Sequence, residues 1–198
     1  MSTKKLGFGL MRLPEKDGKI DIEQVKTMVD MFMEKGFTYF DTAYMYHNHE
    51  SERAVKRALS SRIDRNRYML ATKMPTMRLK ESGDAERIFA EQQEKCGVDY
   101  FDYYLIHCLD TDLYRVATDL KVFDFCLQKK AEGKIGRLGF SFHDTADVLD
   151  KILTEHPEME FVQLQINYLD WESPTVQSRL CYEVARKHGK EIIIMEPI

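Results

Sequence analysis

Cysteine is scarce in this sequence, and the residues present are widely spaced. No Cys-x-x-Cys pair occurs, so neither a zinc ion nor an iron–sulfur cluster is expected within these residues. Isolated cysteines of this kind are typical of reduced thiols in a cytoplasmic protein, which is the location we expect. The four cysteines are Cys96, Cys108, Cys126 and Cys181.

Long apolar runs and an excess of positive charge are also missing. No run approaches the ~20 apolar residues that span a membrane. The N-terminal Met1–Leu6 leads directly into Gly7 and Gly9, which is too short and too rich in glycine for a signal peptide. The formal net charge is −4, without the basic footprint that is typical of nucleic-acid-binding proteins. We therefore expect contact with neither a membrane nor nucleic acid.

What the sequence does contain is enough apolar material for one core. The chain has 198 residues, of which 43% are hydrophobic and 31% are charged, and no linker divides it. We expect residues 1–198 to form a single domain.

Apolar strand-like runs alternate with amphipathic helical stretches along the whole chain. Strands are predicted at about 5–11, 37–41, 68–73, 102–107, 136–142, 161–167 and 191–196. Helices are predicted at about 21–36, 50–60, 83–97, 115–132, 145–155 and 174–189. Apolar strands that alternate with helices indicate a parallel sheet covered on both faces.

Seven such strands predict an α/β fold of the TIM type, a (β/α)8 barrel that lacks its last βα unit. A complete barrel of this type usually needs about 250 residues. The last predicted strand would then have an open edge, through which the chain could associate with itself. An open doubly wound sheet is the alternative, but Gly7 and Gly9 are not followed by the third glycine of a phosphate-binding loop.

Three chemically distinct side chains follow three predicted strands at the point where each strand ends. These are Asp41, Lys73 and His107, and Tyr46 follows shortly after Asp41. The carboxyl ends of parallel strands meet at the ligand-binding face of such folds, so we expect the four side chains to cluster there. An ammonium group lowers the pKa of a nearby phenol, which favours proton transfer to a carbonyl oxygen. A purely structural Asp–Lys ion pair is the alternative.

The run His47-Asn48-His49 suggests a second chemistry. A His-x-His pair in a βα barrel resembles the metal-dependent amidohydrolases, which place such a pair on their first strand. Here His47 and His49 follow the second predicted strand instead. A solvated loop without a metal ion is therefore the favoured interpretation.

Several longer runs resemble the signature of the aldo-keto reductases, and they follow the family's order along essentially the whole chain. They are GFTYFDTAYMY at 36–46, followed by Glu50, LATK at 70–73, DYFDYYLIH at 99–107, KIGRLGFS at 134–141 and FVQLQINY at 161–168. The resemblance implies a reductase that acts on a small carbonyl substrate with NADPH or NADH. It implies that Tyr46 is the general acid, that Lys73 and Asp41 tune it, and that His107 aids substrate binding.

The same resemblance suggests cofactor and substrate contacts. It implies that Ser141 and Gln163 lie near the nicotinamide carboxamide and that the backbone at Gly9 and Met11 approaches the cofactor. Tyr44 and Trp171 are expected to line the substrate pocket. For each of these residues the alternative is an ordinary structural role in a turn, a strand end or the core.

Two runs, NYLDWE at 167–172 and IMEP at 194–197, particularly resemble a bacterial subgroup whose longer members carry a C-terminal iron–sulfur domain. In the family, residues around the eighth strand hold the adenosine phosphate of the cofactor. We therefore expect a truncated reductase with impaired cofactor binding. The alternative is a non-catalytic subunit with the same fold that senses nucleotides or takes part in an assembly.

Overall fold

The computed structural model describes residues 4–197, and the outermost residues of the predicted domain, 1–3 and 198, lie outside this range. Seven parallel strands form one sheet in the order β1-β4-β5-β6-β7-β8-β9. The strands are β1 (Gly7–Gly9), β4 (Tyr39–Asp41), β5 (Met69–Met74), β6 (Phe101–Leu109), β7 (Ile135–Phe142), β8 (Phe161–Gln165) and β9 (Glu191–Met195). The predicted seven-stranded incomplete barrel is thereby confirmed.

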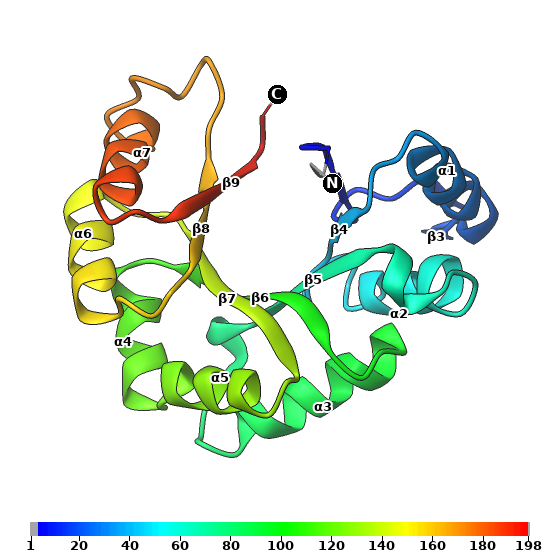
Figure 1. Cartoon of the computed structure of the whole chain (residues 1–198), viewed down its shortest axis with the longest axis horizontal. Helices are drawn as coiled ribbons and strands as arrows, with labels where there is room; N and C mark the ends of the chain where they lie inside the picture. Colours follow the sequence, from blue (N-terminus) through cyan, green and yellow to red (C-terminus); the bar gives the residue numbers. More distant parts are fainter. Residues whose placement is uncertain (1–3, 198) are drawn as a thin grey trace.

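The sheet curls, and the helices cover its outer face (Figure 1). Figure 1 also shows that the curl is open where β9, in red, faces the blue start of the chain. The helices are α1 (Ile22–Glu34), α2 (Ser51–Val55), α3 (Asp84–Cys96), α4 (Thr111–Asp119), α5 (Val122–Ala131), α6 (Ala146–Glu155) and α7 (Ser178–Lys187). A π-helical turn (Lys56–Ser60) extends α2, and short 3₁₀ turns cover Arg65–Arg67 and Thr76–Arg78.

Alternation along the strands creates two apolar layers. The larger layer lies between the sheet and the outer helices and includes Phe40, Leu70 and Tyr104. The smaller layer fills the concave side with Ala71, Leu105 and Phe161, against which Tyr39, Tyr103 and Ile193 pack. Lys73 follows Ala71 by two residues, so its side chain also belongs to the concave side.

Three local features differ from the sequence-based prediction. A two-stranded hairpin, β2 (Glu15–Lys16) with β3 (Lys19–Ile20), precedes α1 and was not predicted. Asp17 and Gly18 both have positive φ, at 53° and 73°, and Asp-Gly at such a turn is a strong hairpin signal.

The other two differences concern helices. The helix predicted at 115–132 is two helices, because Lys121 adopts a left-handed conformation with φ of 55°. The helix predicted from Pro174 begins only at Ser178, after Gln177, which also has a positive φ of 53°. A helix needs consecutive right-handed residues, so a left-handed residue ends or delays it. No helix in residues 4–197 is both long enough and apolar enough to cross a membrane.

Candidate active site

Strand register brings Asp41 and Lys73 together. β4 ends at Asp41, which pairs with Ala71 of β5. β5 continues for three residues beyond that pair, to Met74, and pairs there only with β6. Lys73 is therefore two residues past the last β4–β5 pair, at the carboxyl end of the sheet.

The Lys73 ammonium is buried and has three oxygen partners. It forms an ion pair with Asp41, donates to the backbone oxygen of Thr42 at 2.9 Å, and donates to the Tyr46 hydroxyl at 3.2 Å. Only 1% of the Lys73 side chain is exposed. The predicted cluster of Asp41, Tyr46 and Lys73 is thus present, and the carbonyl of Thr42 is a partner that the sequence analysis did not single out.

Asp41 is held from the opposite side of the curl. Its Oδ2 accepts a hydrogen bond from Gln163 Nε2 of β8 at 3.1 Å and lies 3.5 Å from the Tyr39 hydroxyl. The carboxylate therefore joins strands β4, β5 and β8 at one point. Gln163 is predicted to lie near a cofactor, and in the structure its side chain hydrogen-bonds Asp41.

Burial and the charged neighbours have opposing effects on the pKa values of Lys73 and Tyr46. Burial lowers the pKa of Lys73, but Asp41 and Tyr46 together outweigh it and raise that pKa above the usual value, so Lys73 is charged. Burial also raises the pKa of Tyr46, and the opposing effect of Lys73 is smaller. The expected net lowering of the Tyr46 pKa is therefore not found. The phenol remains protonated at neutral pH, and Lys73 limits the rise in its pKa.

His107 adjoins Tyr46. The two rings meet edge to face, with their centroids 6.0 Å apart. Burial, with a further contribution from the charge of Lys73, lowers the pKa of His107 to about 3. His107 is thus a neutral imidazole across the physiological range, and its buried Nδ1 has no hydrogen-bond partner among the described residues.

Ser141 fixes the chain immediately after His107. Its hydroxyl accepts a hydrogen bond from the backbone N–H of Cys108 at 2.8 Å. Cys108 has a positive φ of 56°, and the pairing of β6 with β7 shifts register between Ile106 and Leu109. This irregularity redirects β6 just beyond His107. Ser141 also pairs with Gln163 across β7 and β8.

Tyr44 contacts helix α3, and Trp171 contacts helix α7. The Tyr44 hydroxyl donates to Glu91 of α3 at 3.0 Å, and Lys95 of α3 lies over its ring. The Trp171 ring packs against Tyr182 of α7. These contacts give no support to Tyr44 as a wall of the substrate pocket, and they select Tyr46 as the tyrosine that meets Lys73.

Gly9, the last residue of β1, and Met11 are both exposed, whereas Leu10 between them is buried. Gly9 pairs with Asp41, and a Cβ atom placed on it would meet no atom within 4 Å. Met11 is 46% exposed. Gly9 thus borders Asp41 with free space around it, and Met11 lies two residues further along the chain.

His47 and His49 stabilise the loop that follows Tyr46. The His47 Nε2 accepts a hydrogen bond from the backbone N–H of Leu13 at 2.7 Å, and its Nδ1 lies 3.2 Å from Glu15. The His49 Nδ1 lies 3.0 Å from the backbone oxygen of Tyr44. The two rings therefore serve different neighbours, which removes the basis of the amidohydrolase interpretation. Within residues 4–197 no group of His, Cys, Asp or Glu side chains has a metal-binding arrangement.

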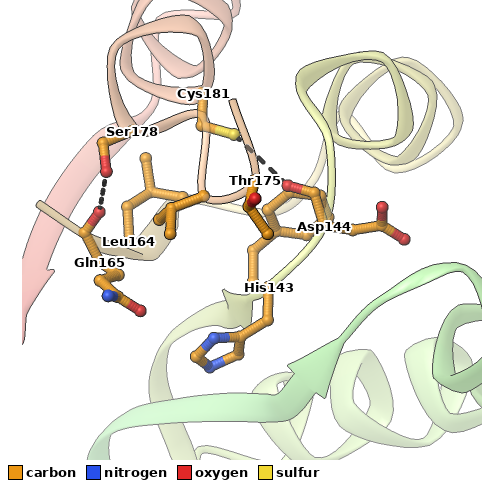
Figure 2. Close-up of a pocket in the computed structure, with 9 residues that line it drawn as sticks. His143, Asp144, Leu164, Gln165, Thr175, Ser178 and Cys181 are labelled. Carbon is orange, nitrogen blue, oxygen red and sulfur yellow. Dashed lines mark hydrogen bonds between the residues drawn. The ribbon is translucent and has the colours of Figure 1, made fainter. Parts of the chain in front are cut away.

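A cavity of about 180 Å³ lies beside the cluster's strands, between the ends of β7 and β8 and helix α7. Its lining includes Phe142, Leu164, Ser178 and Cys181, but none of Asp41, Tyr46, Lys73 and His107. Figure 2 shows the His143 ring turned away from Ser178 and Cys181. The Tyr46 cluster therefore lies outside this cavity, at the carboxyl end of β4, β5 and β6.

Comparison with known proteins shows which family the chain belongs to. Residues 5–198 match the model of the Aldo/keto reductase family. The chain belongs to the aldo/keto reductase family. It is 29% identical over 158 residues to an aldo-keto reductase of Mycobacterium avium, an alignment that covers 79% of this chain and 50% of that protein.

Solved aldo-keto reductases share the fold. A putative aldo-keto reductase of Pseudomonas aeruginosa superposes with a TM-score of 0.78 at 19% identity, covering 99% of this chain and 74% of that one. An aldo-keto reductase of Klebsiella pneumoniae, solved in complex with NADPH, gives 0.71 at 20% identity, covering 96% and 62%. The chain spans about half the length of the curated relatives that it matches.

Proposed function

We propose that this chain is the catalytic part of an NADPH- or NADH-dependent carbonyl reductase that converts an aldehyde or a ketone to an alcohol. The observation that carries the proposal is the buried Lys73 ammonium, which contacts both the Asp41 carboxylate and the Tyr46 hydroxyl. A structural ion pair does not require a phenol at hydrogen-bond distance from the ammonium, whereas a phenol that donates a proton benefits from a cation that stabilises its phenolate.

Each side chain has a distinct task in this proposal. Tyr46 donates its phenolic proton to the carbonyl oxygen as the alcohol forms. Lys73 stabilises the phenolate that is left, and Asp41 keeps the ammonium in place against Tyr46. The neutral imidazole of His107, beside the Tyr46 ring, binds and orients the carbonyl group.

The residues around the cluster fit a nicotinamide cofactor, which when bound would supply the hydride. The Klebsiella relative was solved with NADPH. The unpartnered His107 Nδ1 shows that the site has polar capacity beyond the protein's own contacts, and the open space at Gly9 admits a ligand. Ser141 and Gln163 would hold the carboxamide, and the backbone at Gly9 and Met11 would lie along the cofactor.

We further propose that the 198-residue chain binds the cofactor weakly. In the described structure β1 and β9 each pair on one side only, so the mouth of the barrel is not enclosed. A mouth with two open edges holds an extended cofactor less firmly than a closed ring of strands. Self-association through these edges, a cytoplasmic location and kinship with the iron–sulfur subgroup remain part of the proposal.

Tyr46→Phe tests the chemistry. At saturating NADPH, which compensates for weak binding, we expect NADPH oxidation with at least one member of a panel of aldehydes. Tyr46→Phe should lower this rate by a factor on the order of 10²–10⁴, since it removes only the proton donor. The matched variant Tyr44→Phe should keep most of the rate, because the Tyr44 hydroxyl bonds Glu91 instead.

Two outcomes would contradict the proposal. One is the absence of NADPH oxidation by the wild-type chain with every aldehyde at saturating cofactor, which would favour a nucleotide-sensing or assembly role. The other is equal turnover by the wild-type chain and Tyr46→Phe. Nicotinamide fluorescence, which reports cofactor binding, separates loss of the proton donor from loss of the cofactor. Tyr46→Phe should leave cofactor binding nearly unchanged.

A further inference from the structure

The backbone at Lys73 lacks sheet support on one side. The last β4–β5 pair is Asp41 with Ala71, and the backbone N–H of Thr42 still donates to the Ala71 oxygen at 2.9 Å. Carbonyl groups two residues apart in a strand point to the same side, so the Lys73 carbonyl also points toward β4. β4 has already ended there, and a buried carbonyl without a partner is costly.

Gln92 supplies the missing hydrogen bond. It lies on α3, is fully buried, and donates from Nε2 to the Lys73 oxygen at 2.9 Å. The same Nε2 donates to Glu52 Oε1 at 2.8 Å, and the Gln92 Oε1 accepts from the Tyr104 hydroxyl at 2.6 Å. A side-chain amide thus supplies the donor that a longer β4 would have supplied from its backbone.

Glu52 fixes the orientation of that amide. Its Oε1 accepts from both Gln92 and the Thr72 hydroxyl, the latter at 2.7 Å. Because Glu52 and the Lys73 carbonyl both accept, Gln92 must turn its NH₂ group toward them and its oxygen toward Tyr104. Glu52 is fully buried and its Oε2 has no hydrogen-bond partner within residues 4–197, so this carboxyl group costs folding free energy. A costly buried group of this kind calls for a role beyond packing.

We propose that Gln92, oriented by Glu52, is a positioning residue that replaces the absent β4 hydrogen bond and holds Lys73 against Tyr46. The inference rests on the proposed function only in taking Tyr46 as the acid. The hydrogen bonds of Gln92 and Glu52 in the described structure reach Thr72, Lys73 and Tyr104 but not Tyr46, so both residues act through Lys73 and Thr72. Thr72 and Lys73 are consecutive residues of β5. Glu52 and Gln92 therefore hold two neighbouring residues of this strand at the point from which the ammonium group projects.

The test compares two adjacent glutamines on α3. Gln92→Leu removes the amide that bonds Lys73, whereas Gln93→Leu removes an exposed amide that donates to the Asp99 backbone oxygen at 2.5 Å. The readout is the ¹H–¹⁵N resonance of the Lys73 ammonium, assigned with Lys73→Met, which is protected from exchange while it is held. Gln92→Leu should speed exchange by about tenfold, the equivalent of one hydrogen bond, and Gln93→Leu should not change it.

Rescue separates positioning from general damage to the core. Glu52→Gln keeps an oxygen acceptor for Gln92 and Thr72, so the exchange rate should stay near that of the wild type, whereas Glu52→Leu should behave like Gln92→Leu. If Gln92→Leu does not fold, Tyr104→Phe frees only the other end of the Gln92 amide and should speed exchange in the same direction. Equal exchange rates in the wild type and Gln92→Leu, or in Gln92→Leu and Gln93→Leu, would overturn the proposal.

The ammonium measurement requires no turnover, so it stands even if the proposed reductase activity fails. Where NADPH oxidation is measured, Gln92→Leu should lower kcat by about tenfold and leave KM for NADPH unchanged. If Gln92→Leu lowered the free energy of unfolding but changed neither the exchange of the Lys73 ammonium nor kcat, the network would contribute to packing alone.

Discussion

Two parts of the sheet, the strands around Lys73 and the edge strand β9, are built in opposite ways. Around Lys73, in the first half of the chain, a buried charge has three oxygen partners, and Gln163 reaches Asp41 across 122 positions of sequence. Around β9, in contrast, Ile194 is 53% exposed, and the loop before α7 presents Tyr168 and Leu169 at 80% and 76% exposure. The ends of the sheet meet through Arg12 and Glu196, an exposed ion pair at 3.4 Å.

This difference separates catalytic chemistry from ligand retention. The proposed acid and its partners are positioned by contacts within β4, β5, β6 and β8. The β9 side offers apolar side chains and an unpaired strand edge but few buried polar contacts. An exposed ion pair such as Arg12–Glu196 contributes little to closing the mouth. We infer that the proton donor is preorganised in this chain, whereas the cofactor-binding site is not.

Lys73→Met is expected to have the largest effect on this contrast. It leaves the Asp41 carboxylate without its cation, and breaking a buried pair from one side costs on the order of 3 kcal/mol. The free energy of unfolding, measured in urea, should fall by about that amount. Carbonyl reduction should be lost as well, because Tyr46 loses the cation beside its hydroxyl.

The matched control lies on the helix that covers the β9 side. Lys187 of α7 pairs with Asp150 at 3.0 Å, and its side chain is 70% exposed. Lys187→Met should leave the urea midpoint near that of the wild type. A comparable loss of stability in Lys73→Met and Lys187→Met would show that the Lys73 region and the β9 side do not differ in the way we describe.

A medium effect is expected from His107, through the pH dependence of stability. Its folded pKa is about 3, whereas an unfolded histidine titrates near 6.5. Between pH 3 and pH 6.5 His107 is protonated in the unfolded state but not in the folded state. Its contribution to the free energy of unfolding is therefore fully present above about pH 6.5 and is lost as the pH is lowered toward 3. This one group can contribute up to about 1.4 kcal/mol per pH unit.

His107→Gln removes that contribution. The variant should lose less stability than the wild type between neutral pH and pH 5 in urea titrations. His143, whose pKa burial also lowers, is present in both proteins and cancels in the difference. Identical slopes for the two proteins would mean that His107 is solvated rather than buried.

The sequence was sufficient for the strand order and for the clustering of Asp41, Tyr46 and Lys73. Both follow from local information, since apolar runs define the strands and polar residues end them. The single-domain prediction and the catalytic roles stay predictions. The Asp17-Gly18 hairpin was missed although its turn signal is local, whereas the left-handed Lys121 and Gln177 carry no residue type that announces such a conformation.

The Gln92 network shows what could not be assigned from pattern alone. Gln92 lies in helical phase with Ala85, Ile88, Phe89 and Cys96, which are all buried. A polar residue on an apolar stripe marks a buried hydrogen bond. Its partner, however, is the Lys73 carbonyl, which has no backbone partner because β4 ends early. The point at which β4 ends is set by tertiary pairing. The periodicity therefore locates the donor but not the acceptor.

The smallest effect on stability is expected at the open edge, with Ile194→Lys. β9 pairs with β8 only, and a lysine on an edge strand opposes pairing with a second copy. Because Ile194 is more than half exposed, the free energy of unfolding should change by no more than about 0.5 kcal/mol. The apparent mass from light scattering should fall, while Leu180→Lys, at an exposed apolar position of α7, should leave it unchanged. A wild-type chain that is a monodisperse monomer at every concentration would show that the edge is protected by other means, and that the β9 side is less exposed to partners than its side chains indicate.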